Sequence, residues 1–205
     1  MALPDWPGWN LIGAYPDHEP DDVGSWLLHH AGETLLLEVP EGLTVADVQA
    51  ALDRLGSPQL RYVTASHDHE DHLDRSVWDD LTLAYPQAKF LHPATVRGDR
   101  LLRLAGEPLW LVKAPKHSRT DVVTVFRGVA MTGDIELGRL ASVNDEVQSW
   151  IKRRSLARLA DFCARCRYHV HSIVSAHLND VRAGIDWPAL FHCEDEDPCP
   201  TNAPA

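Results

Sequence analysis

Positively charged side chains are scarce in this chain, where 19 lysines and arginines face 30 aspartates and glutamates and the formal net charge is −11. Such a charge repels the phosphate backbone, so we expect no nucleic-acid partner. No apolar run reaches the length of about 20 residues that a membrane-spanning helix requires. The first residues, MALPDWPGWN, lack the basic stretch and apolar core of a signal peptide. We therefore expect a cytoplasmic protein without membrane association.

Cysteine is also sparse, with 4 residues in a chain of 205. In a cytoplasmic protein these are expected to be reduced thiols rather than a disulfide framework. Cys163 and Cys166 are one turn apart in a predicted helix, and Cys193 and Cys199 fall in the final segment. A separate four-thiolate zinc site is one interpretation, but apolar packing of the helical pair is the favoured one.

Short apolar runs alternate with amphipathic segments along most of the chain. This alternation predicts an α/β fold, and the length suits a single core, so we expect one domain over residues 1–192 and an acidic, proline-rich tail over 193–205. Trp6, Trp9 and Trp26 are expected in that core, with a wall of the functional site as the alternative. Strands are predicted at 9–15, 26–30, 34–39, 60–65, 89–91, 109–112, 122–126, 129–132 and 169–175, and helices at 45–55, 76–85, 95–105 and 147–167.

Three histidines and an aspartate gather directly after the predicted strand at 60–65, at His67, His69, Asp71 and His72. Imidazole nitrogens and carboxylate oxygens suit zinc, iron and manganese. A loop at the end of a strand can direct such a run toward two adjacent ions. The alternative is a solvated, histidine-rich loop tip. The position after a strand favours a metal site.

Five elements of the chain, in the same order, resemble those of the metallo-β-lactamase-fold hydrolases over about residues 9–190. The family motif HxHxDH stands at 67–72, a later histidine in KHSRTD at His117, and an apolar strand ends in Gly133 and Asp134. A helix containing Leu156 and Leu159 then leads through a strand to His177. The resemblance implies a four-layer αβ/βα sandwich in which two mixed sheets are flanked by helices.

The resemblance also implies a ligand set for two divalent metal ions, with zinc expected first and manganese or iron as alternatives. Asp134 would bridge the two ions, and Asp71 and Asp134 are the catalytic candidates that would orient the nucleophile. On the residues alone, Asp134 could be a turn residue after a strand and His177 a buried core histidine. One ion would be held by His67, His69 and His117, and the second by Asp71, His72 and His177.

The implied activity is hydrolysis of an ester, lactone or thioester bond in a small-molecule substrate by a metal-bound hydroxide. One alternative is a persulfide dioxygenase of the same fold, with a single iron held by His67, His117 and Asp134. Another is a non-catalytic metal-binding protein. Two departures from the family pattern indicate a reduced active site: Glu38 stands near the end of a strand where many members carry aspartate, and Ala176 replaces the usual glycine before the last histidine.

Charged residues near the predicted site point in opposite directions. Lys113, Lys116 and Arg119 flank His117 and could hold an anionic group, or could form a solvated basic rim. The first long loop carries acidic side chains that would repel anions from its side, at Asp17, Glu19, Asp21 and Asp22.

Overall fold

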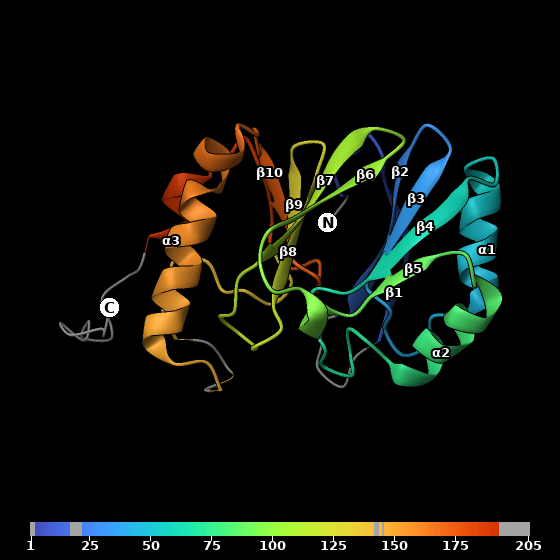
Figure 1. The fold of residues 1–205 in the computed structure, drawn as a ribbon, viewed down its shortest axis with the longest axis horizontal. Coiled ribbons are helices and arrows are strands. Elements are labelled where there is room, and N and C mark those ends of the chain that lie inside the picture. The colour runs from blue at the N-terminus through green and yellow to red at the C-terminus, as the bar shows by residue number, and fades with distance from the viewer. Residues whose placement is uncertain (1–2, 17–21, 142–143, 145, 193–205) are drawn as a thin grey trace.

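The computed structural model describes residues 3–16, 22–141, 144 and 146–192 (Figure 1). The predicted tail with Cys193 and Cys199 lies outside these ranges, as do Asp17, Glu19 and Asp21. Of the helices that are described, none has the length and hydropathy needed to span a membrane.

Two mixed sheets face each other in the middle of the molecule (Figure 1). Neighbouring strands are antiparallel except for the parallel pairs β3–β4, β4–β5 and β9–β10. The first sheet has the order β1-β2-β3-β4-β5, from Trp9–Tyr15, Val23–His30, Glu33–Leu37, Gln59–Thr64 and Lys89–Leu91. The second has the order β11-β10-β9-β8-β7-β6, from Val181–Ala183, Ser172–Val174, Val129–Met131, Val122–Phe126, Glu107–Lys113 and Arg100–Leu104.

Helices cover the outer faces of both sheets. Helices α1 (Val45–Arg54) and α2 (Arg75–Ala84) lie against the first sheet, and α3 (Ser149–Cys166) lies against the second (Figure 1). Short 3₁₀ turns occur at Pro93–Thr95 and Pro188–Phe191. The result is the four-layer sandwich that the sequence resemblance implies.

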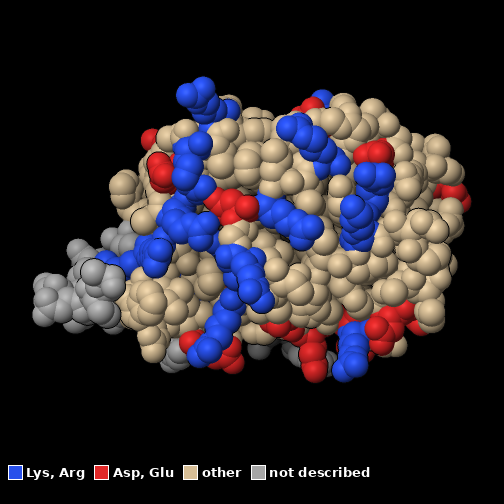
Figure 2. Space-filling model, viewed as in Figure 1, with Lys and Arg blue, Asp and Glu red and all other residues tan. Residues whose placement is uncertain are grey.

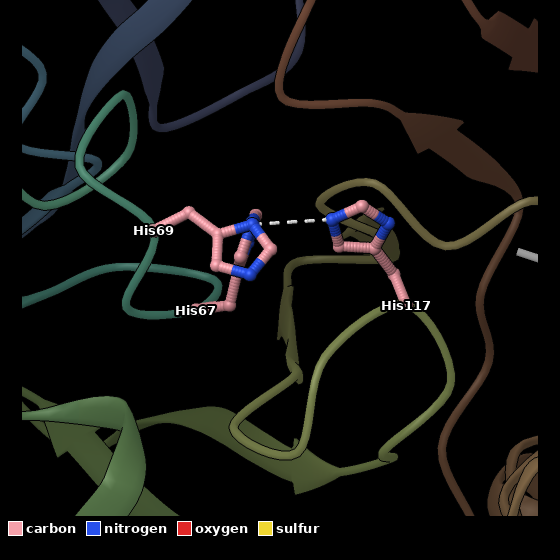
Figure 3. A group of neighbouring side chains, drawn as sticks. All are labelled: His67, His69 and His117. Carbon is pink, nitrogen blue, oxygen red and sulfur yellow. Dashed lines mark hydrogen bonds between the residues drawn. The ribbon is translucent and has the colours of Figure 1, made fainter. Parts of the chain in front are cut away.

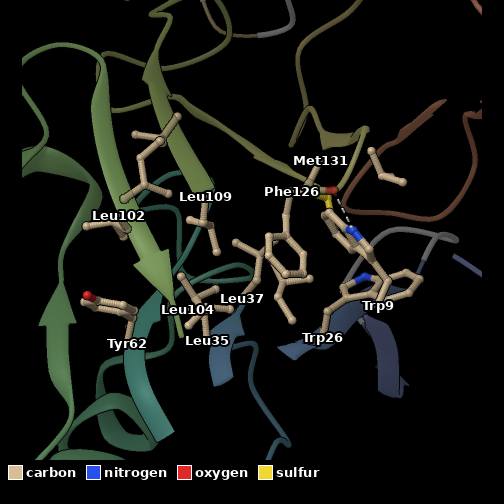
Figure 4. Close-up of a cluster of buried hydrophobic side chains, with 14 of the residues drawn as sticks. Trp9, Trp26, Leu35, Leu37, Tyr62, Leu102, Leu104, Leu109, Phe126 and Met131 are labelled. Atoms are coloured by element: carbon tan, nitrogen blue, oxygen red, sulfur yellow. Dashed lines mark hydrogen bonds between the residues drawn. The ribbon is translucent and has the colours of Figure 1, made fainter. Parts of the chain in front are cut away.

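Alternation along the strands separates the core into layers. In β3, Leu35 and Leu37 point between the sheets, whereas Leu36 points toward α1, because successive side chains of a strand face opposite ways. Figure 4 shows the cluster between the sheets, to which Leu109 and Met131 contribute from the second sheet. A separate cluster joins α3 to the second sheet and includes Cys163 and Cys166 at its partly buried edge, which fits their expected packing role.

The three N-terminal tryptophans are core residues, as predicted. Trp6, Trp9 and Trp26 are each at most 6% exposed, and their ring centroids lie 5.8 to 6.4 Å apart. The indole N–H of Trp9 donates to the backbone oxygen of Phe126 at 3.0 Å (Figure 4), which satisfies a buried polar group. This bond joins the first strand of one sheet to the other sheet.

The predicted helix at 95–105 is wrong. Arg100–Leu104 forms β6, in which Leu102 and Leu104 are buried and Arg103 is exposed, a period of two rather than 3.6. Ala105 and Gly106 have φ values of 45° and 92°, which suits the tight turn of the β6–β7 hairpin. Gly106 therefore closes a hairpin instead of ending a helix. The short strand β11 was not predicted either, because it has only three residues and all are partly or fully exposed.

Candidate metal centre

The candidate ligands follow the C-terminal ends of four strands. His67, His69, Asp71 and His72 come after β4, His117 after β7, Asp134 after β9 and His177 after β10. The two sheets bring these strand ends to one edge of the sandwich, the lower edge in Figure 1. All seven predicted ligands fall into two groups. Within each group, the ligand atoms all lie within 4.8 Å of one another.

The first group contains three imidazoles (Figure 3). His67 Nε2 lies 3.1 Å from His69 Nδ1, which lies 3.3 Å from His117 Nε2. Zinc–nitrogen bonds of about 2.0–2.1 Å at tetrahedral angles place two ligand nitrogens about 3.3 Å apart. The three nitrogens therefore have the spacing of ligands to one ion. Ser66 Oγ lies 3.0 Å from His67 Nδ1 and can accept a hydrogen bond from a proton on that nitrogen, which leaves Nε2 free to bind a metal ion.

The second group combines two carboxylates with two imidazoles. His72 Nε2 lies 3.0 Å from Asp71 Oδ2 and 3.2 Å from Asp134 Oδ2. His177 Nε2 lies 3.4 Å from Asp134 Oδ2 and 3.8 Å from Asp71 Oδ2. These oxygen and nitrogen donors suit a second divalent ion.

Asp134 lies between the groups. Its Oδ2 atom is 3.8 Å from both His67 Nε2 and His117 Nε2, in addition to its contacts with the second group. Its Oδ1 atom is buried and has no hydrogen-bond partner in the described part of the chain. Burial raises the pKa of Asp134, but hydrogen bonds from His177 and His72 outweigh that effect and hold it well below its ordinary value. An ionised carboxylate in this position fits the bridging role that the resemblance implies.

Glu38 is a candidate positioning residue whose contacts the sequence did not reveal. It is completely buried and has a φ of 67° just after β3. Its Oε1 accepts a hydrogen bond from the Ser66 N–H at 3.0 Å, and its Oε2 lies 3.3 Å from His72 Nδ1. Apart from this contact, Glu38 Oε2 and His72 Nδ1 have no hydrogen-bond partner among the described residues. Glu38 thus holds both ends of the histidine loop and can accept the Nδ1 proton of His72, which leaves Nε2 for a metal.

Asp121 has a similar role for His117. Its Oδ2 accepts hydrogen bonds from the backbone N–H groups of Lys116, His117 and Ser118 at 2.8, 2.7 and 2.9 Å. Its Oδ1 accepts one from the Ser118 hydroxyl at 2.6 Å. The position of the aspartate just after the histidine in KHSRTD is the only sequence signal for this role. One buried carboxylate thereby fixes the turn that carries a candidate ligand.

The two ligand loops are also tied to each other. The Val122 N–H donates to the Ser66 backbone oxygen at 2.7 Å, and the Asp68 N–H donates to the Thr120 hydroxyl at 3.2 Å. These bonds connect the loop after β4, in the first sheet, to Thr120 and to Val122 at the start of β8, in the second sheet. The first metal group is therefore assembled by the docking of the two sheets.

Gly133 allows the backbone before Asp134 to approach the histidine loop. Its φ is +61°, and a Cβ atom there would lie 2.8 Å from Ser66 Cβ. We expect Gly133→Ala to lower the free energy of unfolding by about 1–3 kcal/mol and to weaken metal binding, because strain and the displaced Ser66 both act on the site. Gly32→Ala is the matched control, since it has φ +84° and open space around its Cβ. Equal effects of the two substitutions in denaturant unfolding and metal titration would contradict this prediction.

The protonation of His72 should make metal binding depend on pH. Burial lowers the pKa of His72, but hydrogen bonds with Asp134, Asp71 and Glu38 raise it well above its ordinary value. The metal-free protein therefore holds a proton that a metal must displace. We expect apparent zinc affinity to increase as pH rises from about 6 to 8, with protons released on binding. Calorimetry in buffers of different ionisation enthalpy measures this release, and a pH-independent affinity would refute it.

One cavity reaches the metal groups, and a second borders the turn that carries His117. The larger, of about 560 Å³, reaches the candidate ligands His69 and Asp71. The smaller, of about 330 Å³, is lined by Arg119 together with Pro115, Glu146, Val147, Gln148 and Ile151. Lys116 is fully buried and its Nζ donates to the Ala141 backbone oxygen at 3.3 Å, so it is not part of a solvated basic rim. Of the three basic residues near His117, Arg119 is the one that is exposed and lines a cavity.

Comparison with known proteins identifies the fold. No family model matches the chain, and no curated protein matches its sequence. A metallo-beta-lactamase family protein from Thermus thermophilus has a TM-score of 0.58 and 20% identity, over 91% of this chain and 77% of that one. The metallo-beta-lactamase MIM-1 from Novosphingobium pentaromativorans has a TM-score of 0.59 and 15% identity, over 82% and 80% of the two chains. ETHE1 from Myxococcus xanthus has a TM-score of 0.59 and 16% identity, over 85% and 77%.

These identities are too low to transfer an activity, but the agreement in fold extends over most of each chain. The facing mixed sheets, the outer helices and these structural relatives together show that the chain has the metallo-β-lactamase fold, as its motifs predict.

Proposed function

We propose that this protein is a metal-dependent hydrolase that cleaves an ester, lactone or thioester bond. Its cofactors would be two divalent metal ions, and zinc is the metal that we expect. The observation that carries the proposal is the position of Asp134 Oδ2, which contacts imidazole nitrogens of both metal groups. Two ions held close together by a shared carboxylate would polarise a carbonyl group and supply hydroxide near neutral pH.

The surrounding residues support this chemistry by their charge. Asp134, whose pKa is held well below its ordinary value, would be ionised and would offset the repulsion between two cations. Burial raises the pKa of Asp71, but the hydrogen bond from His72 helps to bring it below its ordinary value, so this carboxylate is also ionised. A carboxylate oxygen of Asp71 or of Asp134 could accept a hydrogen bond from the attacking water and orient it. Glu38 and Asp121 act through His72 and His117, whose rings and backbone they position.

Two alternatives differ from this proposal in ways that the site can distinguish. A dioxygenase with one iron would use His67, His117 and Asp134, which lie near one another. The complete second group favours two ions instead. A non-catalytic metal-binding protein needs no access to its ions, whereas here a cavity of about 560 Å³ reaches His69 and Asp71. Access and a full ligand set together favour hydrolysis.

Chelation and metal restoration test the proposed function. We expect the purified protein to hydrolyse at least one member of a panel of esters, lactones and thioesters, to lose this activity with a chelator, and to regain it with zinc or manganese. His117→Ala should abolish the activity, while His169→Ala, at an exposed histidine outside both metal groups, should retain it. Elemental analysis should give two ions per chain. One iron per chain, with oxygen uptake on glutathione persulfide and no hydrolysis, would favour the dioxygenase.

A further inference from the structure

The larger cavity beside the candidate metal centre has a wall of one charge. Among the residues that the structure describes, seven line it, of which five are carboxylic acids and none is lysine or arginine. Two members, His69 and Asp71, belong to the two metal groups, so the cavity is the approach to that centre on grounds that do not depend on its charge. The lining residues are Pro16, Glu41, Asp68, His69, Glu70, Asp71 and Asp74.

Three of these carboxylates already have a structural partner. Asp74 Oδ1 accepts the Val77 N–H at 2.8 Å and caps α2, and Asp68 accepts a hydrogen bond from the Thr120 hydroxyl. Asp71 contacts His72. Glu41 and Glu70, in contrast, are exposed and make no hydrogen bond or ion pair with any residue that the structure describes. Their charges are therefore available to a molecule in the cavity.

The basic residues near His117 are not among the described residues that line this cavity. Arg119 lines the separate cavity next to α3, and Lys116 is buried against the Ala141 backbone. Figure 2 shows that acidic side chains stand along the lower edge of the molecule, among some basic ones, and that lysines and arginines are numerous over the face in view. The described lining of the cavity next to α3 has one charge of each sign, at Arg119 and Glu146, whereas that of the larger cavity is acidic.

We propose that the part of the substrate that enters this cavity is positively charged, so that the preferred substrate is an ester or thioester with an ammonium group. The inference rests on the proposed hydrolase function for its reaction, but the charge preference of the cavity can be measured without turnover. A cleft lined by carboxylates raises the local concentration of cations and repels anions. The carbonyl group reaches the metal centre while the ammonium group stays beside Glu41 and Glu70.

Three acetyl thioesters that differ in the charge of the thiol part test the preference: acetylthiocholine, S-ethyl thioacetate and S-acetylthioglycolate. After subtraction of spontaneous hydrolysis, we expect kcat/KM for the cationic compound to exceed that for the anionic one by about tenfold or more at low salt. The gap should narrow between 0.01 and 0.1 M salt, as the Debye length falls from about 30 to about 10 Å. Equal rates, or faster turnover of the anionic compound, would overturn the inference and direct attention to the Arg119 side.

A pair of double variants separates the cavity from the total charge. Glu41→Gln with Glu70→Gln removes two carboxylates from the wall, and Asp79→Asn with Asp80→Asn removes two exposed ones on α2 that do not line the cavity. The cationic-to-anionic ratio of kcat/KM should fall several-fold in the first variant and stay unchanged in the second. Equal falls in both would mean that net charge, rather than the cavity, sets the preference, and the inference would be wrong.

A binding measurement distinguishes failure of this inference from failure of the proposed hydrolase function. Choline chloride, added to the protein without metal and compared with sodium chloride at equal ionic strength, should shift the NMR amide signals of Glu41 and Glu70 but not those of Asp79 and Asp80. These shifts without hydrolysis of any thioester would refute the hydrolase and support the cation site. Hydrolysis without a charge preference and without these shifts would support the hydrolase and refute the cation site. If neither hydrolysis nor the shifts were observed, both proposals would be refuted.

Discussion

Replacing Asp134 with alanine should remove about one metal ion per chain and slow turnover by about a thousandfold. The shared oxygen would be lost from both groups, and two cations would face each other without the carboxylate that offsets their repulsion. Each ion would stabilise the charged transition state by several kcal/mol, so loss of one ion would account for a change of this size. Metal content measured on the desalted protein, together with kcat, checks the prediction.

Two further variants make the result specific. Asp134→Asn keeps one neutral oxygen and should restore metal binding only in part. Asp79→Ala, at an exposed position on α2, should leave both measurements unchanged. If Asp134 is only a turn residue, its replacement by alanine should cost no more than about 1 kcal/mol of stability. Unchanged metal content and rate in a folded Asp134→Ala variant would refute the bridging assignment.

The seven candidate ligands could be proposed from the sequence because they stand in elements that resemble the family's motifs in the same order. His67 to His72 form one run, Asp134 follows a glycine at a strand end, and His177 follows an apolar strand. The topology then needs only to bring the strand ends to one edge of the sandwich, which mixed sheets of this order achieve. The structure groups all seven as the motifs indicate.

The residues that position the ligands could not be assigned in the same way. Glu38, just after β3, accepts a hydrogen bond from the Ser66 N–H and contacts His72, both in the loop after β4. Neither of these long-range contacts is visible in the sequence. The acidic cavity has the same origin, because Glu41, Glu70 and Asp74 come together only when two loops fold side by side. The incorrect helix at 95–105 shows a different limit. In that segment, the spacing of leucines fits both periods, and only pairing with β7 selects the strand.

The second large effect is expected from Glu38→Gln. The side chain keeps its volume, but an amide has one acceptor oxygen where the carboxylate has two. If the oxygen accepts the Ser66 N–H, the NH₂ group faces His72 Nδ1 and requires that nitrogen to be an acceptor. The proton of neutral His72 then moves to Nε2, the atom that should bind the metal. We expect affinity at the second metal group to fall by about 10- to 100-fold, the usual effect of losing such a partner.

The tautomer of His72 provides a readout that a merely structural role would not change. In the metal-loaded native protein, ¹⁵N NMR of the imidazole should show a proton on Nδ1, whereas Glu38→Gln should weaken or lose that signal and bind its second zinc ion less tightly. Glu107→Gln, at a partly buried glutamate on β7 away from both metal groups, is the control for the loss of one carboxylate. Glu38→Ala would leave the buried Ser66 N–H unpaired as well, at a cost of about 1–3 kcal/mol in stability. Native zinc affinity and an unchanged tautomer in Glu38→Gln would mean that the glutamate only fills space beside His72.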